Sequence, residues 1–285
     1  MPIVPFPNNS SADLEAHLAE LAALGLTVVA DVLSPDQLRE LPAVVDRALA
    51  ARQLHPGQKP EHVVNYNMCA NLISYAPVFA ELCLHPAVYS IVQRLLGTDV
   101  VLSTIAALEP KPGATDANGG EIQGLHRDGL GGGLSVAGLP GCQSLWLLDD
   151  MDPQNGATRF GIGTHKLDVP QDMDIEKWVK EEGRLVQFSL LAGCVVLYDA
   201  RTLHAMSTNH AGRRRALACF FTQAGLPRMC DQRYFLSPKI QAQVSPPARV
   251  MLGPDSLEPL SACGKFYQPG ATLPQCSVGA SAFST

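Results

Sequence analysis

Residues 190–204 read Leu-Leu-Ala-Gly-Cys-Val-Val-Leu-Tyr-Asp-Ala-Arg-Thr-Leu-His, which predicts a glycine-marked turn, a buried apolar strand and then a histidine, His204. A turn at 209–212 and a second apolar strand, Arg213–Thr222, follow it. Two such strands are expected to pair as neighbours. This pairing would bring an arginine at the start of the second strand close to His204, where a guanidinium could bind a carboxylate through two hydrogen bonds.

The rest of the chain fits a β core with helices outside it. Short apolar runs separated by glycine and proline turns extend from Val100 to Thr222, a pattern typical of a sandwich or barrel. Helical patterns lie upstream of these runs. One helix is expected to begin at the capping sequence Ser34-Pro35-Asp36-Gln37, and another to run from Pro86 to about Leu96 and end at Gly97.

Length and composition indicate one catalytic domain over residues 1–285, with a helical part at about 11–97, a β core at about 98–222 and a C-terminal extension at 223–285. The net charge of −6 and the pI near 5.7 argue against binding to nucleic acid or to an anionic membrane surface. The amino terminus lacks the basic flank and apolar run that are typical of a signal peptide, and no stretch approaches about 18 apolar residues, so we expect a cytoplasmic protein. The eight cysteines form no CxxC pair, which predicts free thiols.

A second motif, His126-Arg127-Asp128, places an imidazole and a carboxylate two residues apart. In extended backbone both side chains point the same way and could share one ion. Together with His204 they would form two histidines and one carboxylate on one face of a metal, the arrangement that suits non-haem Fe(II). Taken singly, each has an ordinary alternative: a turn for His-x-Asp, a core histidine for His204, and a solvated basic cluster for Arg213–Arg215.

These motifs, together with Asn155-Gly-Ala-Thr-Arg-Phe-Gly-Ile-Gly-Thr-His-Lys166, resemble the phytanoyl-CoA dioxygenase family of Fe(II)/2-oxoglutarate oxygenases. The resemblance also includes Gly25–Val29 and His85-Pro86, so that it spans most of residues 14–222. It implies a double-stranded β-helix, also called a jelly roll or cupin-like fold, and a homodimer. The implied reaction uses Fe(II), 2-oxoglutarate and O2, releases succinate and CO2, and oxidises a small secondary metabolite.

The resemblance also implies roles for particular residues. His126, Asp128 and His204 would be the iron ligands, and Arg215 would bind the far carboxylate of 2-oxoglutarate. Arg213 would face the same side of an ideal strand as Arg215, and Arg214 would face away. Gln123 and Thr158 would be co-substrate contacts. Because halogenating relatives have a small residue in place of the Asp128 carboxylate, hydroxylation, desaturation or rearrangement is expected.

The sequence gives less information about the substrate. Asn65, Asn67 and Met68 lie in a stretch of apolar and amide side chains that would suit a neutral molecule, and Trp146 could line the same pocket. An ordinary strand with turn-forming asparagines, and a tryptophan that fills the core, explain these residues equally well. Gly129–Gly133 would suit a mobile segment over the metal. Two alternative functions remain open, an acyl-CoA hydroxylase and a non-catalytic jelly-roll binding protein.

Overall fold

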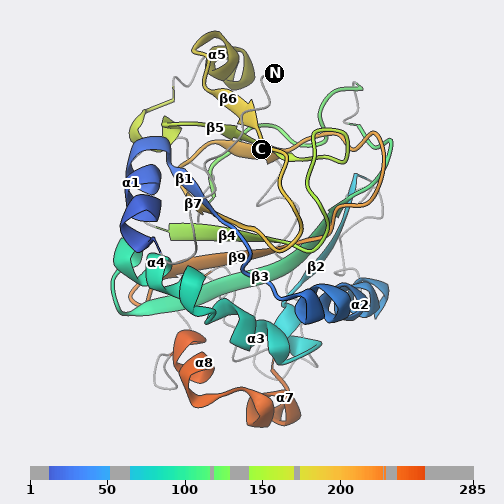
Figure 1. Ribbon diagram of the computed structural model, residues 1–285, viewed down its shortest axis with the longest axis vertical. Coiled ribbons are helices and arrows are strands. Elements are labelled where there is room, and N and C mark those ends of the chain that lie inside the picture. Colours follow the sequence, from blue (N-terminus) through green and yellow to red (C-terminus); the bar gives the residue numbers. More distant parts are fainter. Residues whose placement is uncertain are drawn as a thin grey trace, which may run out of the picture.

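The computed structural model of the 285-residue chain describes residues 13–51, 65–115, 119–128, 141–169, 174–226, 228 and 236–253. Two antiparallel sheets form its centre (Figure 1). The large sheet contains, in spatial order, β1 (Leu26–Val29), β7 (Val195–Asp199), β4 (Gly141–Leu147), β9 (Ala216–Gln223), β3 (Val100–Pro110) and β2 (Tyr66–Ala70). The small sheet contains β6 (Leu185–Gln187), β5 (Thr158–Gly161) and β8 (His204–Met206). The expected mainly β jelly roll with flanking helices is confirmed. The expected direct pairing of the strand before His204 with the strand after it is wrong, because β4 lies between β7 and β9 and pairs with both.

Helices cover the face of the large sheet that points away from the small sheet (Figure 1). They are α2 (Pro35–Ala51), α3 (Val78–Cys83) and α4 (Pro86–Leu96), with α7 (Pro238–Gln243) and α8 (Pro246–Met251) beyond them. The 3-10 turn η2 (Leu72–Ser74) packs in the same outer cluster, whereas α1 (Leu14–Leu24), α5 (Ile175–Glu181) and the 3-10 turn η3 (Thr164–Lys166) lie elsewhere around the sheets. The large sheet is therefore buried on both faces.

Alternation along the strands of the large sheet divides its core residues between two clusters, and a third, smaller cluster lies around α5 and the small sheet. In β4, Cys142 and Trp146 pack with the helices on the outer face, whereas Leu145 and Leu147 pack toward the small sheet. In β9, Leu217 belongs to the outer cluster and Ala218 to the inner one. Since successive strand side chains point to opposite faces, this division shows which residues look into the space between the sheets.

The two helices expected upstream are present with the predicted ends. Ser34 and Gln37 form a capping box, in which Ser34 N donates to Gln37 Oε1 (2.9 Å) and Gln37 N donates to Ser34 Oγ (3.2 Å). The helix α4 has Pro86 in its first turn and ends at Gly97. The sequence did not predict α3 or α5, because six or seven residues show too little periodicity for a helix to be recognised.

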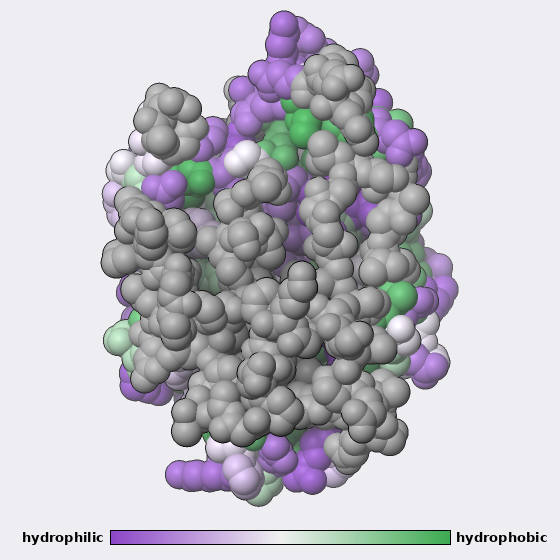
Figure 2. All heavy atoms as spheres, turned by 180° about the vertical axis from the view of Figure 1, so that it is seen from behind, coloured by the Kyte–Doolittle hydropathy of each residue, from purple (hydrophilic) through white to green (hydrophobic). Residues whose placement is uncertain are grey.

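The five described cysteines are Cys69, Cys83, Cys142, Cys194 and Cys219, and all are buried thiols that are not in a disulfide. Within the described ranges, we find no helix with the length and hydropathy that a bilayer crossing requires. The view from behind shows hydrophilic side chains gathered at the end of the molecule that carries α5 (Figure 2). Lys180 and Glu176 of that helix form an ion pair at 3.2 Å, so its outer surface is charged.

Candidate metal centre

The structure brings His126, Asp128 and His204 together although Asp128 and His204 are 76 positions apart in the sequence. One nitrogen or oxygen atom of each lies within 4.8 Å of the others. Main-chain hydrogen bonds set this approach: His126 N donates to His204 O (3.1 Å), and His204 N donates to His126 O (3.0 Å). Asp128 N donates to Ala200 O (2.9 Å), so the His-x-Asp segment is extended without being part of a regular strand.

Hydrogen bonds also fix the tautomer of each histidine. Nδ1 of His126 lies 3.1 Å from the carbonyl oxygen of Gly124, and Nδ1 of His204 lies 2.9 Å from that of Thr202. A carbonyl oxygen can only accept, so both Nδ1 atoms carry the proton and donate it. The Nε2 atoms keep their lone pairs and lie 3.9 and 3.5 Å from the Asp128 carboxylate oxygens. This is how proteins usually orient histidine for a metal.

Burial sets the charge state of the group. Desolvation, with a smaller contribution from His204, lowers the pKa of His126 to about 4, and desolvation lowers that of His204 to about 4. Burial also raises the pKa of Asp128 to about 6, and the nearby His126 offsets only part of this rise. The Asp128 Oδ2 atom is buried without a hydrogen-bond donor. Two imidazole lone pairs and an orphaned carboxylate oxygen at one point fit a divalent cation well.

The residue between the two ligands anchors the motif on the opposite side. Arg127 is buried, and its Nη2 donates to the carbonyl oxygens of Thr164 (2.6 Å) and Leu167 (2.5 Å). The Thr164 hydroxyl in turn accepts from Leu203 N (2.9 Å), directly before His204. The segment 163–166, singled out in the sequence, thus connects the two metal-ligand segments and contributes no ligand of its own.

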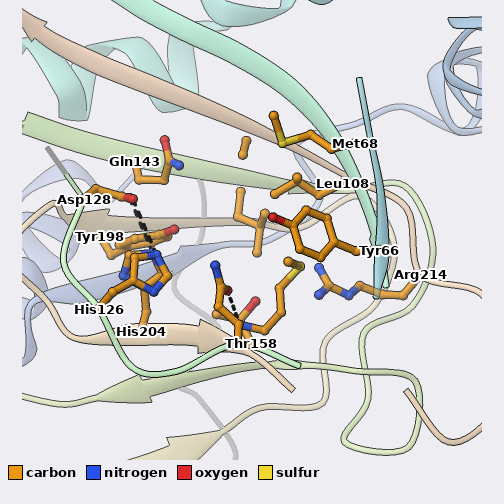
Figure 3. A pocket seen from close by; sticks show the side chains of 14 residues that line it. Tyr66, Met68, Leu108, His126, Asp128, Gln143, Thr158, Tyr198, His204 and Arg214 are labelled. Carbon is orange, nitrogen blue, oxygen red and sulfur yellow. Dashed lines mark hydrogen bonds and ion pairs between the residues drawn. The ribbon is translucent and has the colours of Figure 1, made fainter. Parts of the chain in front are cut away.

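The three side chains line one end of a pocket between the two sheets, with roughly 480 Å³ of empty space including its mouth. Figure 3 shows Asp128, His126 and His204 together at one end and Arg214 at the other. Seven further residues line the pocket without having been predicted from sequence: Tyr66, Leu108, Gln143, Leu145, Tyr198, Met206 and Ala218.

The predicted register of the arginines is wrong by one residue. Arg214, expected to face away, lines the pocket and is fully buried. Arg215 instead points outward and forms hydrogen-bonded ion pairs with Asp149 and Asp46. Arg213 also lies on the outer side, paired with Glu109 and Asp46. The reason is that Arg214 shares the inner face with Ala216 and Ala218 of the strand that follows.

The guanidinium of Arg214 is only partly satisfied. Its Nη2 donates to the carbonyl oxygen of Gly156 (2.7 Å), whereas its Nε and Nη1 are buried without an acceptor. Desolvation lowers the pKa of Arg214 to about 10, which still leaves it charged at neutral pH. A buried cation with two unused donors is costly unless an anion binds to it, so this end of the pocket is suited to a carboxylate.

Gln123 and Thr158 both line the pocket. The Gln123 side-chain oxygen accepts from Met206 N (2.9 Å), so its amide group is fixed at the end of β8. Its main-chain oxygen accepts from Nη2 of the buried Arg159 (2.7 Å). Thr158 lies next to Arg159 on β5 and pairs with Met206 of β8.

Of the four residues predicted to contact substrate, only Met68 lines the pocket. Asn67 faces the other side of β2 and its amide donates to Glu109 Oε2 (3.0 Å). Asn65 precedes β2, and its carbonyl oxygen accepts from Lys111 N. These two asparagines and Trp146 are corrections: alternation along β2 and β4 turns Asn67 and Trp146 away from the pocket. Gly129–Gly133 lie outside the described residues.

Trp146 is a core residue on the outer face of β4. It is fully buried, its Nε1 donates to Ser144 Oγ (3.0 Å), and its ring meets His85 edge-on at a centroid distance of 6.2 Å. We expect Trp146→Ala to lower the free energy of unfolding by about 3–5 kcal/mol, because the deleted ring leaves a cavity. Chemical denaturation measures this loss. The half-buried Trp178→Ala is the control and should cost less; an equal cost would contradict the core assignment.

One signal in the sequence could have revealed the inner face. The strand is apolar from Ala216 to Phe221, so polarity does not distinguish its faces, but residue size does over its first three residues. Small Ala216 and Ala218 lie on the pocket side, whereas Leu217 and Phe221 lie against the helices. Counting back from Ala218 and Ala216 in steps of two residues leads to Arg214 on the same face. Small side chains facing inward leave room for a ligand, which is why size alternates here.

Comparisons with known proteins agree with this geometry. The sequence profile of the family described as "Phytanoyl-CoA dioxygenase (PhyH)" matches residues 23–217. "Dioxygenase cnsJ" of Penicillium expansum is 24% identical over 82% of this chain and 74% of its own length. A "PKHD-type hydroxylase" of Pseudoalteromonas atlantica is 29% identical over 74% of this chain and 83% of its own.

Solved structures with the same fold include the "epimerase SnoN in complex with Fe3+, alpha ketoglutarate and nogalamycin RO". It superposes with a TM-score of 0.58 at 21% identity, covering 75% of this chain and 84% of the SnoN chain. This likeness shows that the two proteins share a fold.

Proposed function

The chain belongs to the phytanoyl-CoA dioxygenase family, and we propose that it is an Fe(II)/2-oxoglutarate-dependent dioxygenase that oxidises a small secondary metabolite and releases succinate and CO2. Hydroxylation, desaturation and rearrangement are the outcomes that the carboxylate ligand favours. Fe(II), 2-oxoglutarate and O2 are the cofactor and co-substrates. A cytoplasmic location and a homodimer stay predictions.

One observation carries the proposal: the same pocket has a metal-binding group at one end and an unsatisfied guanidinium at the other (Figure 3). A dicarboxylic keto acid has complementary ends, a keto-carboxylate that can chelate a metal and a second carboxylate that an arginine can bind. Neither end alone would distinguish 2-oxoglutarate from other small acids. The two together suit a small acid that has a chelating keto-carboxylate and a second carboxylate.

We assign the following roles. His126, Asp128 and His204 hold the iron through two Nε2 atoms and a carboxylate oxygen, and Arg214 binds the far carboxylate of 2-oxoglutarate. When bound, iron and 2-oxoglutarate activate O2 for attack on a C–H bond. The chain supplies orientation and a dry site: Leu108, Leu145 and other apolar side chains line the pocket. Such walls keep water from the reacting groups and strengthen the Arg214–carboxylate attraction.

Gln123 and Thr158 support the same assignment as polar co-substrate contacts. Both line the pocket, and both belong to segments that the small sheet holds in place. Met68 is proposed as a substrate contact, together with Tyr66 on the same face of β2. These side chains are neutral, which suits an uncharged natural product more than a highly charged substrate.

The acyl-CoA alternative is less well supported. Binding of a nucleotide with several phosphates calls for clustered cations, whereas Arg214 is the only lysine or arginine among the residues that line the described pocket. A non-catalytic binding protein would not need to retain a metal-ligating group. The intact His-Asp-His group therefore favours the enzyme.

The direct test is oxidation of 2-oxoglutarate in the absence of organic substrate. Purified protein with Fe(II), 2-oxoglutarate and O2 should form succinate slowly, and a chelator should stop this. Titration calorimetry should show that 2-oxoglutarate binds only when a divalent metal is present. If neither succinate formation nor metal-dependent binding is detected, the proposed function is wrong. If the protein is active, mass spectrometry of candidate metabolites after the same incubation would identify its substrate.

A further inference from the structure

We propose that Asp149 is a positioning residue for 2-oxoglutarate: its ion pair with Arg215, on the outer face of the sheet, fixes the register that points Arg214 into the pocket. The inference rests on the proposed function, because it assigns Arg214 to the far carboxylate. It also explains why three consecutive arginines precede β9, although only the middle one reaches the pocket.

Arg214 lies in a segment whose direction the sheet alone does not set. The paired residues of β9 begin at Ala216, opposite Leu147 and Leu108, so Arg214 precedes the paired region by two residues. One further main-chain bond, from Leu148 N to Arg215 O (3.1 Å), extends the contact with β4. A slip of one residue in such a segment would exchange the inner and outer side chains.

Asp149 holds this segment by both main chain and side chain. Its Oδ2 accepts from Arg215 N (2.8 Å) and Arg215 Nε (2.8 Å), and its Oδ1 accepts from Arg215 Nη2 (2.7 Å). The two-point guanidinium contact is a strong and directional ion pair. Because the carboxylate also binds the peptide N–H, it restrains the backbone of Arg215 as well as its side chain. Arg215 cannot then turn inward.

The pocket side does little to hold Arg214 in place. Its guanidinium makes one described hydrogen bond, to Gly156 O, and two of its nitrogens have no acceptor. A buried, half-satisfied cation would gain hydration by turning toward solvent. The outer ion pairs oppose this rotation, since turning Arg214 outward would move Arg215 into the pocket and separate it from Asp149. The ion pairs on the outer face of the sheet therefore offset the cost of burying the Arg214 guanidinium with two nitrogens unpaired.

Arg213 contributes less to this restraint. Its side chain is half exposed and pairs with Asp46 and Glu109, and no carboxylate in the described structure binds its peptide N–H. The Arg215 side chain is 13% exposed. Solvent weakens the outer pairs of Arg213 more than those of Arg215. Asp149 is therefore the carboxylate whose loss should matter most.

The test compares two keto acids bound to the Mn(II)-loaded protein, measured by titration calorimetry. In Asp149→Asn, we expect the Kd for 2-oxoglutarate to rise roughly ten- to a hundredfold, which is less than for complete loss of a buried charge partner. The Kd for 2-oxobutyrate, which lacks the far carboxylate, should not change, and neither should the Kd for Mn(II). Asp150→Asn is the matched control, because Asp150 binds Ala192 N and has no described contact with the arginines. It should leave all three constants unchanged.

The inference is overturned if Asp149→Asn leaves the Kd for 2-oxoglutarate unchanged, or if it weakens both keto acids equally, which would indicate general damage. Arg215→Lys provides a second variant that keeps the charge and loses the two-point contact. It should raise the Kd for 2-oxoglutarate alone, and an unchanged value would again overturn the inference. Arg214→Ala distinguishes failure of this inference from failure of the proposed function. If this variant leaves the Kd for 2-oxoglutarate unchanged, the proposed co-substrate site itself is wrong.

Discussion

Asp128→Ala is expected to abolish substrate oxidation and metal binding while leaving the metal-free protein folded and at least as stable as the wild type. The carboxylate is the one anionic ligand in the group, so its loss leaves two neutral imidazoles to hold the ion. In the metal-free protein Asp128 is buried with an unpaired oxygen, so removing it should not lower the free energy of unfolding. Calorimetric titration with Mn(II) and chemical denaturation measure the two effects.

His204→Ala should behave like Asp128→Ala toward the metal. Asp36→Ala is the matched control, because Asp36 is an exposed carboxylate on α2 whose ion pair with Arg39 is far from the pocket in the fold. It should retain full activity. Retained oxidation in Asp128→Ala or in His204→Ala would reject the assignment of the metal ligands.

Arg214→Ala is expected to weaken 2-oxoglutarate binding by about 2–5 kcal/mol, which corresponds to roughly a thirtyfold to several-thousandfold rise in Kd. The guanidinium is fully buried, and no other lysine or arginine lines the described pocket. Binding of Mn(II) should be unaffected, since Arg214 lies at the opposite end of the pocket (Figure 3). Calorimetry on the Mn(II)-loaded protein measures both constants.

Arg214→Lys should recover part of the affinity, because lysine restores the charge but not the two-point geometry. Arg213→Ala is the control on the neighbouring position: it removes an outer, half-exposed guanidinium and should have a much smaller effect. If Arg213→Ala raised the Kd for 2-oxoglutarate as much as Arg214→Ala, the structural register would not describe the working enzyme.

Local signals in the sequence were sufficient to predict much of the fold. The Ser34–Gln37 capping box and the Pro86 and Gly97 ends of α4 follow from hydrogen-bonding and backbone rules that act within a few residues. The grouping of His126, Asp128 and His204 spans a large sequence separation. It became predictable only because the motifs resembled those of a known family.

The arginine register and the substrate residues were not predictable in the same way. Polarity reveals the inner face of a strand only when the other face meets solvent, and here helices cover that other face. Trp146 and Asn67 looked like pocket residues because their side chains suit one. Whether these side chains face outward or into the pocket depends on the register of β4 and β2, which no single motif encodes.

The reciprocal peptide bonds between His126 and His204 have a consequence for how such enzymes diversify. Since the main chain fixes the two imidazoles relative to each other, the coordinates of the reactive centre do not depend on the identity of the surrounding pocket side chains. Residues such as Met68 and Tyr66, on a different sheet, are free to be exchanged by mutation without displacing the ion. New substrates can therefore be accommodated by successive changes in the pocket-lining side chains, while the metal-binding residues stay in place.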